Sequence, residues 1–217
     1  MEKVIDRKEQ LAIENSYHKI YWDNDPEFEE VRKLCLQDHN NWLRDNYTRE
    51  NMDLNDQCGY SVVYRKDTDE PMFMSGMMAS GLWDPKIARL MNRLYVFPKF
   101  QQRTVQGLAW GWENFEYHMI NPLIEANKGR YKAYFISMQS RPGKDPNNWW
   151  RACKKTFMMA IDNWTDENEH MIKVCGSDVQ KCYHHYFYTN VEENYFENST
   201  KNSLITFDKW KNLPTGK

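Results

Sequence analysis

The chain has 217 residues, which is enough for one domain with a substantial buried core. Its net charge of −2 at pH 7, with both signs mixed along the sequence, argues against a nonspecific nucleic-acid binder, so nucleic acid could bind only through a local patch. The five cysteines are odd in number, far apart and without a CxxC pair, which argues against a disulfide framework or a zinc site, so we expect no metal.

Membrane and secretion signals are also missing from the sequence pattern. No apolar run approaches the ~20 residues of a membrane span, and the first ten residues are charged, unlike a signal peptide. We therefore expect a cytoplasmic protein with no membrane partner. Asn and Lys are abundant, which is typical of AT-rich coding sequence and makes a phage a reasonable source; the location would then be the host cytoplasm.

The N-terminal part predicts an arm, a strand and two helices. Residues 1–15 are charged with scattered apolar positions, as in a short helix or a loose arm. Residues 16–22 are rich in aromatic and branched side chains and predict a strand. Pro26 marks a helix start, so residues 27–36 predict a helix with acidic residues in its first turns. Residues 40–47 predict a second, short helix.

Three consecutive strands are expected next, arranged as an antiparallel meander. Residues 58–66 form the first strand, and a polar turn leads to a second strand over residues 71–83, broken by Gly76 and Gly81. Residues 87–96 alternate with period two and form the third strand, which Pro98 ends because proline cannot donate to a ladder.

A polar run and a long amphipathic helix follow this third strand. The helix is expected to begin near Thr104, with an apolar stripe, and to be kinked or ended at Pro122. The stripe consists of Val105, Leu108, Ala109, Trp112, Phe115, Met119, Leu123 and Ile124. A polar turn that feeds a helix N-terminus presents free backbone N–H groups, which suits a phosphate.

The last third predicts a strand, a helix and a hairpin. The strand covers residues 130–137. The helix is capped by Asn147 or Asn148 and has an apolar stripe consisting of Trp150, Cys153, Phe157, Ile161 and Trp164. The hairpin pairs residues 171–175 with 181–189. We divide the chain into an arm (1–15), a domain (16–190) and a polar C-terminal extension (191–217) that packs back through Phe207 and Trp210.

The segment LYVFPKFQ, residues 94–101, resembles the central motif of the GNAT superfamily of acyl-CoA-dependent N-acyltransferases. The shared features are a strand ending near V-x-P, an aromatic residue two positions after the proline, and a loop of the form Q/R-x-x-G-x-G/A. The loop here is QQRTVQ, residues 101–106. Its first position matches, but Thr104 and Gln106 replace the small residues and Gly107 comes one position late, so the CoA-binding loop is degenerate.

This resemblance implies an α/β (α+β) fold, a mixed, largely antiparallel sheet flanked by helices. The expected order β-α-α-β-β-β-α-β-α-β-β over residues 16–190 is the GNAT order. In such folds the strand before the cofactor loop and the strand after the long helix splay apart, and the acyl chain lies in the gap. Those strands would be residues 87–96 and 130–137.

The resemblance also implies transfer of an acyl group, acetyl first of all, from acyl-CoA to a primary amine on an unidentified acceptor. A backbone N–H of the central strand would meet the oxyanion. The cofactor-binding residues would be Leu94, Val96, Lys99, Gln101, Gln102, Arg103, Thr104, Val105 and Gln106. The catalytic candidates are Tyr95, through its backbone amide on the central strand, and Ser137, one of the nearest hydroxyl groups, because the family's usual glutamate and tyrosine have no counterpart here.

Two alternatives stay open on these residues. The same scaffold could be an enzyme with another cofactor, for example in phage nucleobase modification. It could also be a catalytically inactive protein-binding module, which the missing glycines, base and tyrosine favour. The loop distinguishes them, because amides that face an open groove favour an enzyme, whereas side chains that fill the groove favour a binding module.

Overall fold

The computed structural model describes residues 7–22, 25–38, 57–79, 84–100, 104–105, 108–109, 112–140, 157–162, 183–200 and 204–206. The chain divides into two compact units. The first contains residues 1–79 and 90–130, and the second contains residues 80–89 and 131–217. One strand, β4 (Ile87–Val96), contributes its first three residues to the second unit and the remainder to the first.

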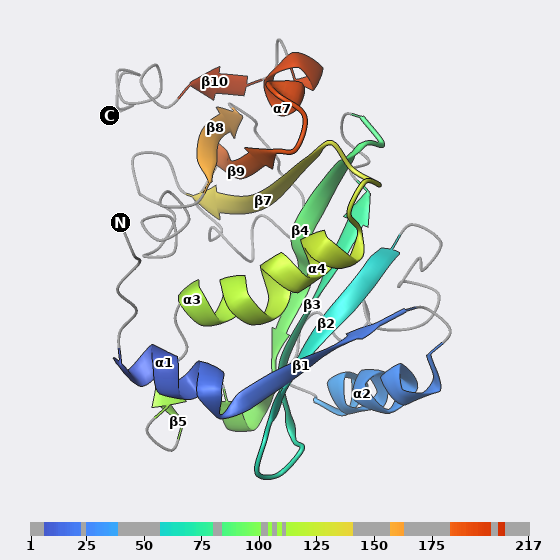
Figure 1. The fold of residues 1–217 in the computed structure, drawn as a ribbon, viewed down its shortest axis with the longest axis vertical. Coiled ribbons are helices and arrows are strands. Elements are labelled where there is room, and N and C mark those ends of the chain that lie inside the picture. The colour runs from blue at the N-terminus through green and yellow to red at the C-terminus, as the bar shows by residue number, and fades with distance from the viewer. Residues whose placement is uncertain are drawn as a thin grey trace, which may run out of the picture. The chain divides into compact units, whose positions relative to one another are not determined.

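The first unit is built on β1 (Ser16–Tyr21), β2 (Gln57–Arg65), β3 (Pro71–Ala79) and the larger part of β4, in that order (Figure 1). Strands β1 and β2 are antiparallel, with Ser16 opposite Arg65, and so are β2 and β3, with Ser61 opposite Ser75. The strands predicted over residues 16–22, 58–66 and 87–96 are confirmed.

Helices cover both faces of these strands. On one face, α2 (Pro26–Gln37) packs Phe28 on Tyr60, with ring centroids 4.9 Å apart. On the other face, Ser61 donates a hydrogen bond to the backbone oxygen of His118, 2.5 Å away. Because neighbouring side chains of a strand point to opposite faces, Tyr60 and Ser61 reach different helices. The interior strands are therefore buried on both sides.

The helix predicted over residues 27–36 is confirmed as α2, and its start has a clear cause. Asp25 accepts a hydrogen bond from the backbone N–H of Glu27, and Pro26 occupies the first turn, where its missing N–H has no cost. The second helix, predicted over residues 40–47, lies outside the described residues.

The long helix begins later than predicted. Thr104–Val105 form β5 and pair with β6 (Leu108–Ala109) in a small antiparallel hairpin, and α3 (Trp112–Phe115) begins only at Trp112. The prediction of a helix from Thr104 is therefore wrong. Two β-branched residues and Gly107 disfavour a helix here, and the same apolar spacing fits a hairpin.

The helical path continues through a wide turn. Segment η3 (Glu116–Ile120) is π-helical, and α4 (Asn121–Ala126) follows it. The N–H of Asn121 donates to the carbonyl oxygen of Glu116, five residues earlier. This irregular turn directly precedes Pro122, which lacks the N–H that an ordinary helical turn would use. Pro122 lies in the first turn of α4 and does not end the helix.

Gly76 does not break β3, contrary to the prediction. It lies in the interior of the strand, opposite Tyr60 of β2. A Cβ atom at this position would lie 2.7 Å from the Tyr60 ring, so glycine is what lets the ring lie across the neighbouring strand. Gly81 lies outside the described residues.

The second unit contains residues 87–89 of β4, β7 (Ala133–Ser140), β9 (Tyr183–Asn190), β8 (Met158–Asp162) and β10 (Leu204–Thr206), in that order. The pairing of β4 with β7 is parallel, and the other pairings of this unit are antiparallel. Together with the first unit this is the predicted fold class, a mixed, largely antiparallel sheet flanked by helices.

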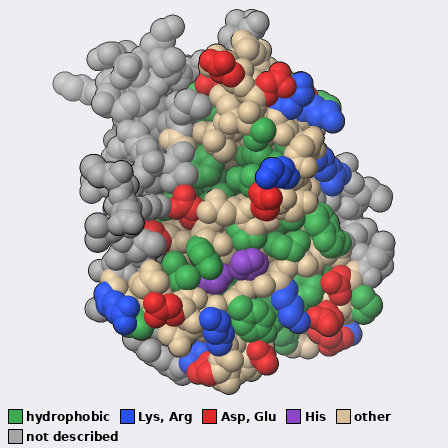
Figure 2. Space-filling view, viewed as in Figure 1, with side chains coloured by type: hydrophobic (Ala, Val, Ile, Leu, Met, Phe, Trp, Pro, Cys, Tyr) green, Lys and Arg blue, Asp and Glu red, His purple; other side chains and the backbone are tan. Residues whose placement is uncertain are grey.

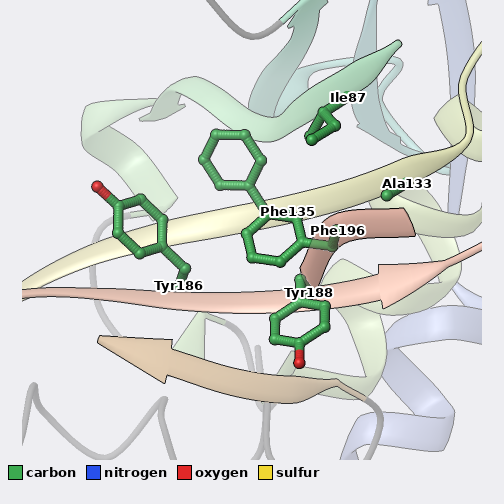
Figure 3. Close-up of a cluster of buried hydrophobic side chains, with 6 residues drawn as sticks. All are labelled: Ile87, Ala133, Phe135, Tyr186, Tyr188 and Phe196. Carbon is green, nitrogen blue, oxygen red and sulfur yellow. The ribbon is translucent and has the colours of Figure 1, made fainter. Parts of the chain in front are cut away.

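The core of the second unit is aromatic (Figure 3). It consists of Ile87, Ala133, Phe135, Tyr186, Tyr188 and Phe196. Phe196 comes from the short helix α7 (Tyr195–Ser199) and stacks on Tyr188 with ring centroids 4.2 Å apart. Residues beyond 190 thus enter this core, while Phe207 and Trp210 lie outside the described residues. The division of the chain at residues 15 and 190 stays a prediction.

A strand replaces the last part of the helix predicted from Asn147 or Asn148. Residues 158–162 form β8, which pairs with β9 and β10. The spacing of Phe157, Ile161 and Trp164 favoured a helix, but a short apolar run fits either structure, and the neighbouring strands decide it. The strand predicted over residues 181–189 is confirmed as β9, whereas residues 171–175 lie outside the described residues.

Candidate functional site

The central strand β4 has an unusual residue shortly after its contact with β7. Residues Ile87–Arg89 pair with Ala133–Phe135, and Met91 then adopts a left-handed backbone with φ of 54°. This conformation costs an L-residue roughly 1–2 kcal/mol, so the surrounding strands must impose it. The gap expected between the two strands stays a prediction.

Tyr95 is the first catalytic candidate; the role predicted for its backbone amide stays a prediction, and its side chain is buried and already bonded. Its side chain is 6% exposed, and its hydroxyl donates to Oδ2 of Asp38 at 2.5 Å. Burial, together with the Asp38 carboxylate, raises the pKa of Tyr95 far above its usual range. The phenol therefore keeps its proton at neutral pH and cannot act as a base there. Leu94 and Val96 beside it are partly buried.

Ser137, the second catalytic candidate, belongs to the other unit. It lies in β7, opposite Tyr186 of β9, and is partly buried. Tyr95 belongs to the first unit, so neither unit by itself contains both residues. A shared catalytic role for the two stays a prediction.

The predicted cofactor loop differs from a loop that enters a helix. After Val96 the chain makes a short 3₁₀ turn, η2 (Pro98–Phe100), with Phe100 buried, and the β5–β6 hairpin follows. Because α3 begins at Trp112, its N-terminus does not directly follow Thr104, and the predicted phosphate site at a helix start is corrected in this respect. Gln101, Gln102, Arg103 and Gln106 lie outside the described residues.

Lys99, also predicted to bind the cofactor, has a carboxylate partner. Its Nζ lies 2.7 Å and 2.6 Å from the two carboxylate oxygens of Glu70, in the turn between β2 and β3. The hydrogen bond from Lys99 holds the pKa of Glu70 below its usual value. A phosphate at Lys99 would therefore have to compete with Glu70.

A pocket that the sequence does not indicate lies in the first unit, beside α1 (Arg7–Glu14), β1 and η3. Its volume is about 530 Å³. The lining residues are Gln10, Ile13, Glu14, Ser16, Tyr17, His18, Lys66, Tyr117 and His118. Histidine side chains reach the surface among hydrophobic side chains and Lys or Arg (Figure 2). The size suits a small organic molecule.

Two histidines and a serine form a hydrogen-bonded chain in this pocket. Nδ1 of His18 lies 3.2 Å from Nδ1 of His118, and Nε2 of His118 lies 2.8 Å from Oγ of Ser16. Oγ of Ser16 in turn lies 2.6 Å from the backbone oxygen of Ala12. Ser16 and His118 are 3% and 1% exposed, whereas His18 is partly buried.

The carbonyl at the end of this chain determines the direction of every hydrogen bond. The Ala12 oxygen can only accept, so Ser16 donates to it, and Nε2–H of His118 donates to Ser16. A neutral His118 then has a bare Nδ1, which accepts from Nδ1–H of His18. His18 therefore carries a lone pair on Nε2, and this nitrogen has no hydrogen-bond partner among the residues that the structure describes. Since the Ser16 proton points at Ala12, Ser16 is not an activated nucleophile.

Both imidazoles are neutral at pH 7. Burial, followed by the nearby His18 and Lys66, lowers the pKa of His118 to about 4. Burial alone lowers the pKa of His18.

Within the described residues, no group of three or more His, Cys, Asp or Glu side chains could hold a metal ion. None of the described helices is long and apolar enough to cross a membrane.

The sequence predicts that Ser16 and His18 lie together, but it does not predict that His118 joins them. Ser16 and His18 are two residues apart on a strand, so they share a face, and this follows from the sequence alone. Their partner His118 is 100 residues away from His18, on a helix whose first turn was misplaced by the predictions above. Only the packing of η3 on β1 brings the three residues together.

Comparisons with known proteins give structural likenesses only. No protein-family model matches the chain, and no curated protein matches it. An acetyltransferase of Bacillus anthracis in complex with acetyl coenzyme A is 12% identical, with a TM-score of 0.39 over 64% of this chain and 65% of that chain, just under two thirds of its length.

Two further likenesses cover almost the whole of the other chain. A GNAT family acetyltransferase of Elizabethkingia anophelis with acetyl-CoA bound is 14% identical, with a TM-score of 0.44 over 82% of this chain and 99% of that one. A dodecameric spermidine N-acetyltransferase of Vibrio cholerae is 10% identical, with a TM-score of 0.46 over 86% of this chain and 99% of that one.

Proposed function

We propose that this chain is an acyltransferase of the GNAT type, which transfers an acyl group from acyl-CoA to a primary amine. The observation that carries the proposal is the parallel pairing of β4 with β7 inside an otherwise largely antiparallel sheet. The V-F-P-x-F motif lies at the end of this same β4, with Phe100 buried in the turn that follows. Motif and topology thus agree at the strand where the resemblance requires it.

The chain would contribute binding and positioning through its backbone. Backbone N–H groups between Leu94 and Val96, after the left-handed Met91, are the candidates to meet an oxyanion. Residues Gln101–Gln106 would contact the phosphates, with Arg103 as the charged side chain. Acyl-CoA, as the donor, supplies the activated thioester.

Calorimetry of acetyl-CoA and free CoA binding tests this function. We expect micromolar binding by the full chain, weakened at least about tenfold by Arg103→Glu, because reversing a charge beside a phosphate removes an attraction and adds a repulsion. Lys86→Glu is the matched control, since Lys86 is exposed and lies before the opposite end of β4. Absence of binding at millimolar ligand would refute the proposal.

A second candidate, a GNAT-like protein-binding module, is favoured by one observation. The described chemical groups near the motif are already bonded within the protein, Tyr95 to Asp38 and Lys99 to Glu70. If the chain binds neither acetyl-CoA nor CoA, capture of a specific protein partner by the tagged full chain would support this candidate. Acetyl-CoA binding together with amine acetylation would exclude it.

A further inference from the structure

The pocket that contains His18 and His118, called the histidine pocket below, also contains Lys66, and no carboxylate of the described residues forms an ion pair with this lysine. Nζ of Lys66 donates to the backbone oxygen of Glu14 at 2.6 Å. Most described lysines form ion pairs, namely Lys19, Lys33, Lys99, Lys128 and Lys132. Within the described part of the chain, Lys66 has no carboxylate at ion-pair distance.

The acidic groups near Lys66 have other partners. The Glu14 carboxylate accepts from Gln10 at 3.0 Å and lies 4.0 Å from Arg7, both on its own helix. Asp69 accepts the hydroxyl of Tyr17, and Asp67 is paired with Arg65. Lys66 is therefore the charged group that acts on His118: burial comes first, then the neighbouring His18 and then Lys66 in lowering the pKa of His118.

The histidine pair has the geometry of a direct hydrogen bond and not of a shared metal site. The ring centroids of His18 and His118 are 5.4 Å apart, while the facing nitrogens are 3.2 Å apart. The line between the nitrogens thus passes nearly through both ring centres. Two imidazoles that share a metal ion instead point their lone pairs at a common third position.

Protonation of His18 at Nε2 would leave this chain of hydrogen bonds intact. His18 would still donate through Nδ1 to His118, and every later bond would keep its direction to the carbonyl of Ala12. The chain ends in the last turn of α1, where backbone carbonyls carry partial negative charge. An imidazolium at His18 is thus compatible with the fold once a partner for its Nε2–H is present.

We propose that this pocket binds a small organic oxyanion, a carboxylate or a phosphate monoester, between Nζ of Lys66 and Nε2–H of His18, and that binding takes up one proton on His18. The Tyr117 side chain of the lining provides surface for an apolar or aromatic part of the ligand. A cationic amine would meet the charge of Lys66. The proposal does not depend on acyl transfer.

The pH dependence follows from the groups that face His18. The titratable groups that line the pocket with His18 are Glu14 of α1, Tyr117 and His118 of η3, and Lys66 after β2, while Arg7 lies 4.0 Å from Glu14. His18 and His118 are the ones with unperturbed pKa values near neutrality, and of these two only His18 has a ring nitrogen without a hydrogen-bond partner among the described residues. Because binding takes up a proton, affinity should rise as the pH falls, by up to about tenfold per pH unit.

Benzoate is the probe for the pH series, since its own charge does not change between pH 8 and 6. The full chain is titrated with benzoate by calorimetry in two buffers of different ionisation enthalpy. We expect uptake of close to one proton at pH 7 and a Kd that falls as the pH falls from 8 towards 7. Binding without proton uptake, or binding that weakens as the pH falls, would overturn the proposal.

Other probes identify the ligand chemistry. Phenyl phosphate is expected to bind if the pocket accepts phosphate monoesters, inorganic phosphate more weakly because it lacks the ring, and butylamine not at all. Tighter binding of butylamine than of either aromatic anion would contradict the assignment of an oxyanion site. A lack of binding by both benzoate and phenyl phosphate at millimolar concentration would do the same.

Two variants separate the roles of the residues. Lys66→Gln should weaken benzoate binding at least about tenfold and retain proton uptake, whereas His18→Asn should abolish proton uptake. Lys86→Gln is the control, because Lys86 is another exposed described lysine without an ion pair. Thermal unfolding verifies that each variant is folded. Equal benzoate affinity in Lys66→Gln and the wild type would refute the role of Lys66.

Discussion

Two polar contacts in the first unit lie on opposite faces of its strands, one at β4 and the other at β1, and they differ in whether every polar group has a partner. On the α2 face, the hydroxyl of Tyr95 donates a hydrogen bond to Asp38, so this hydroxyl has a partner within the protein. On the α1 and η3 face, the chain from Ser16 through His118 ends at Nε2 of His18, which has no partner among the described residues. One contact holds the structure together, while the other leaves a titratable group at a pocket.

The difference shows that residue type near a motif is a poor guide to availability. Tyr95 lies inside the segment that resembles a known family, yet its oxygen is committed to a neighbouring carboxylate. His18 lies in the edge strand β1 and outside that motif, yet its Nε2 has no hydrogen-bond partner in the part of the chain that the structure describes. Whether a side chain can bind a ligand or exchange a proton depends on which hydrogen-bond partners the fold supplies, and these come from distant parts of the chain.

The largest expected effect is a loss of stability in acid that is caused by His118 in the pocket. The folded-state pKa of His118 is about 4, below its unfolded value near 6.5, so the unfolded state binds the extra proton first. The free energy of unfolding should therefore be highest above pH ~6.5 and fall as the pH drops towards 4, by about 3 kcal/mol. Denaturant unfolding at several pH values measures this.

The control for this prediction is His118→Gln, which keeps a polar side chain but removes the titration. Its free energy of unfolding should fall less than that of the wild type between pH 6.5 and 5, a window above the titration of ordinary carboxylates, and the remaining fall comes from His18, whose pKa is also lowered. Equal falls in the wild type and in His118→Gln would show that His118 is protonated without penalty in the folded protein.

The second effect concerns the hydrogen bond between Tyr95 and Asp38. Tyr95→Phe removes one hydrogen bond to a carboxylate and should lower the free energy of unfolding by about 1–3 kcal/mol. Tyr117→Phe is the matched control, since Tyr117 is 54% exposed, and we expect a change within about 0.5 kcal/mol. Chemical denaturation compares the two variants, and equal losses would mean that the Tyr95–Asp38 contact contributes no more than an exposed hydroxyl.

The smallest effect is expected at the surface ion pair of Lys99 and Glu70, whose side chains are 53% and 39% exposed. Lys99→Gln should change the free energy of unfolding by about 0–1 kcal/mol, because solvent screens exposed pairs. Denaturation at low and high salt measures it, and a loss that exceeds the one in Tyr95→Phe would reverse the ranking of buried and exposed contacts.

Much of the architecture could be predicted from the sequence, and the errors share a cause. The alternation in residues 87–96 predicts β4 with its observed ends, and Pro26 with the acidic first turn predicts α2. The β5–β6 hairpin and β8 were predicted as helix. In both segments the apolar spacing fits either structure, and pairing with neighbouring strands decides.

The candidate sites divide in the same way. The sequence points to Tyr95 and Lys99 through a local motif, but their bonding to Asp38 and Glu70 depends on segments 57 and 29 residues away. His18 and His118 carry no joint signal, because 100 residues separate them.

The sequence by itself determined the strands with period-two alternation, the capped helix α2 and the placement of the V-F-P-x-F motif at a strand end. These features arise from interactions between near neighbours in the chain, so residue order is sufficient to specify them. The tertiary structure alone decided which ambiguous segments became strands and which polar groups have partners within the protein. It also decided that His18 contacts His118 at a pocket. Those outcomes depend on packing between distant segments, which local residue patterns do not encode.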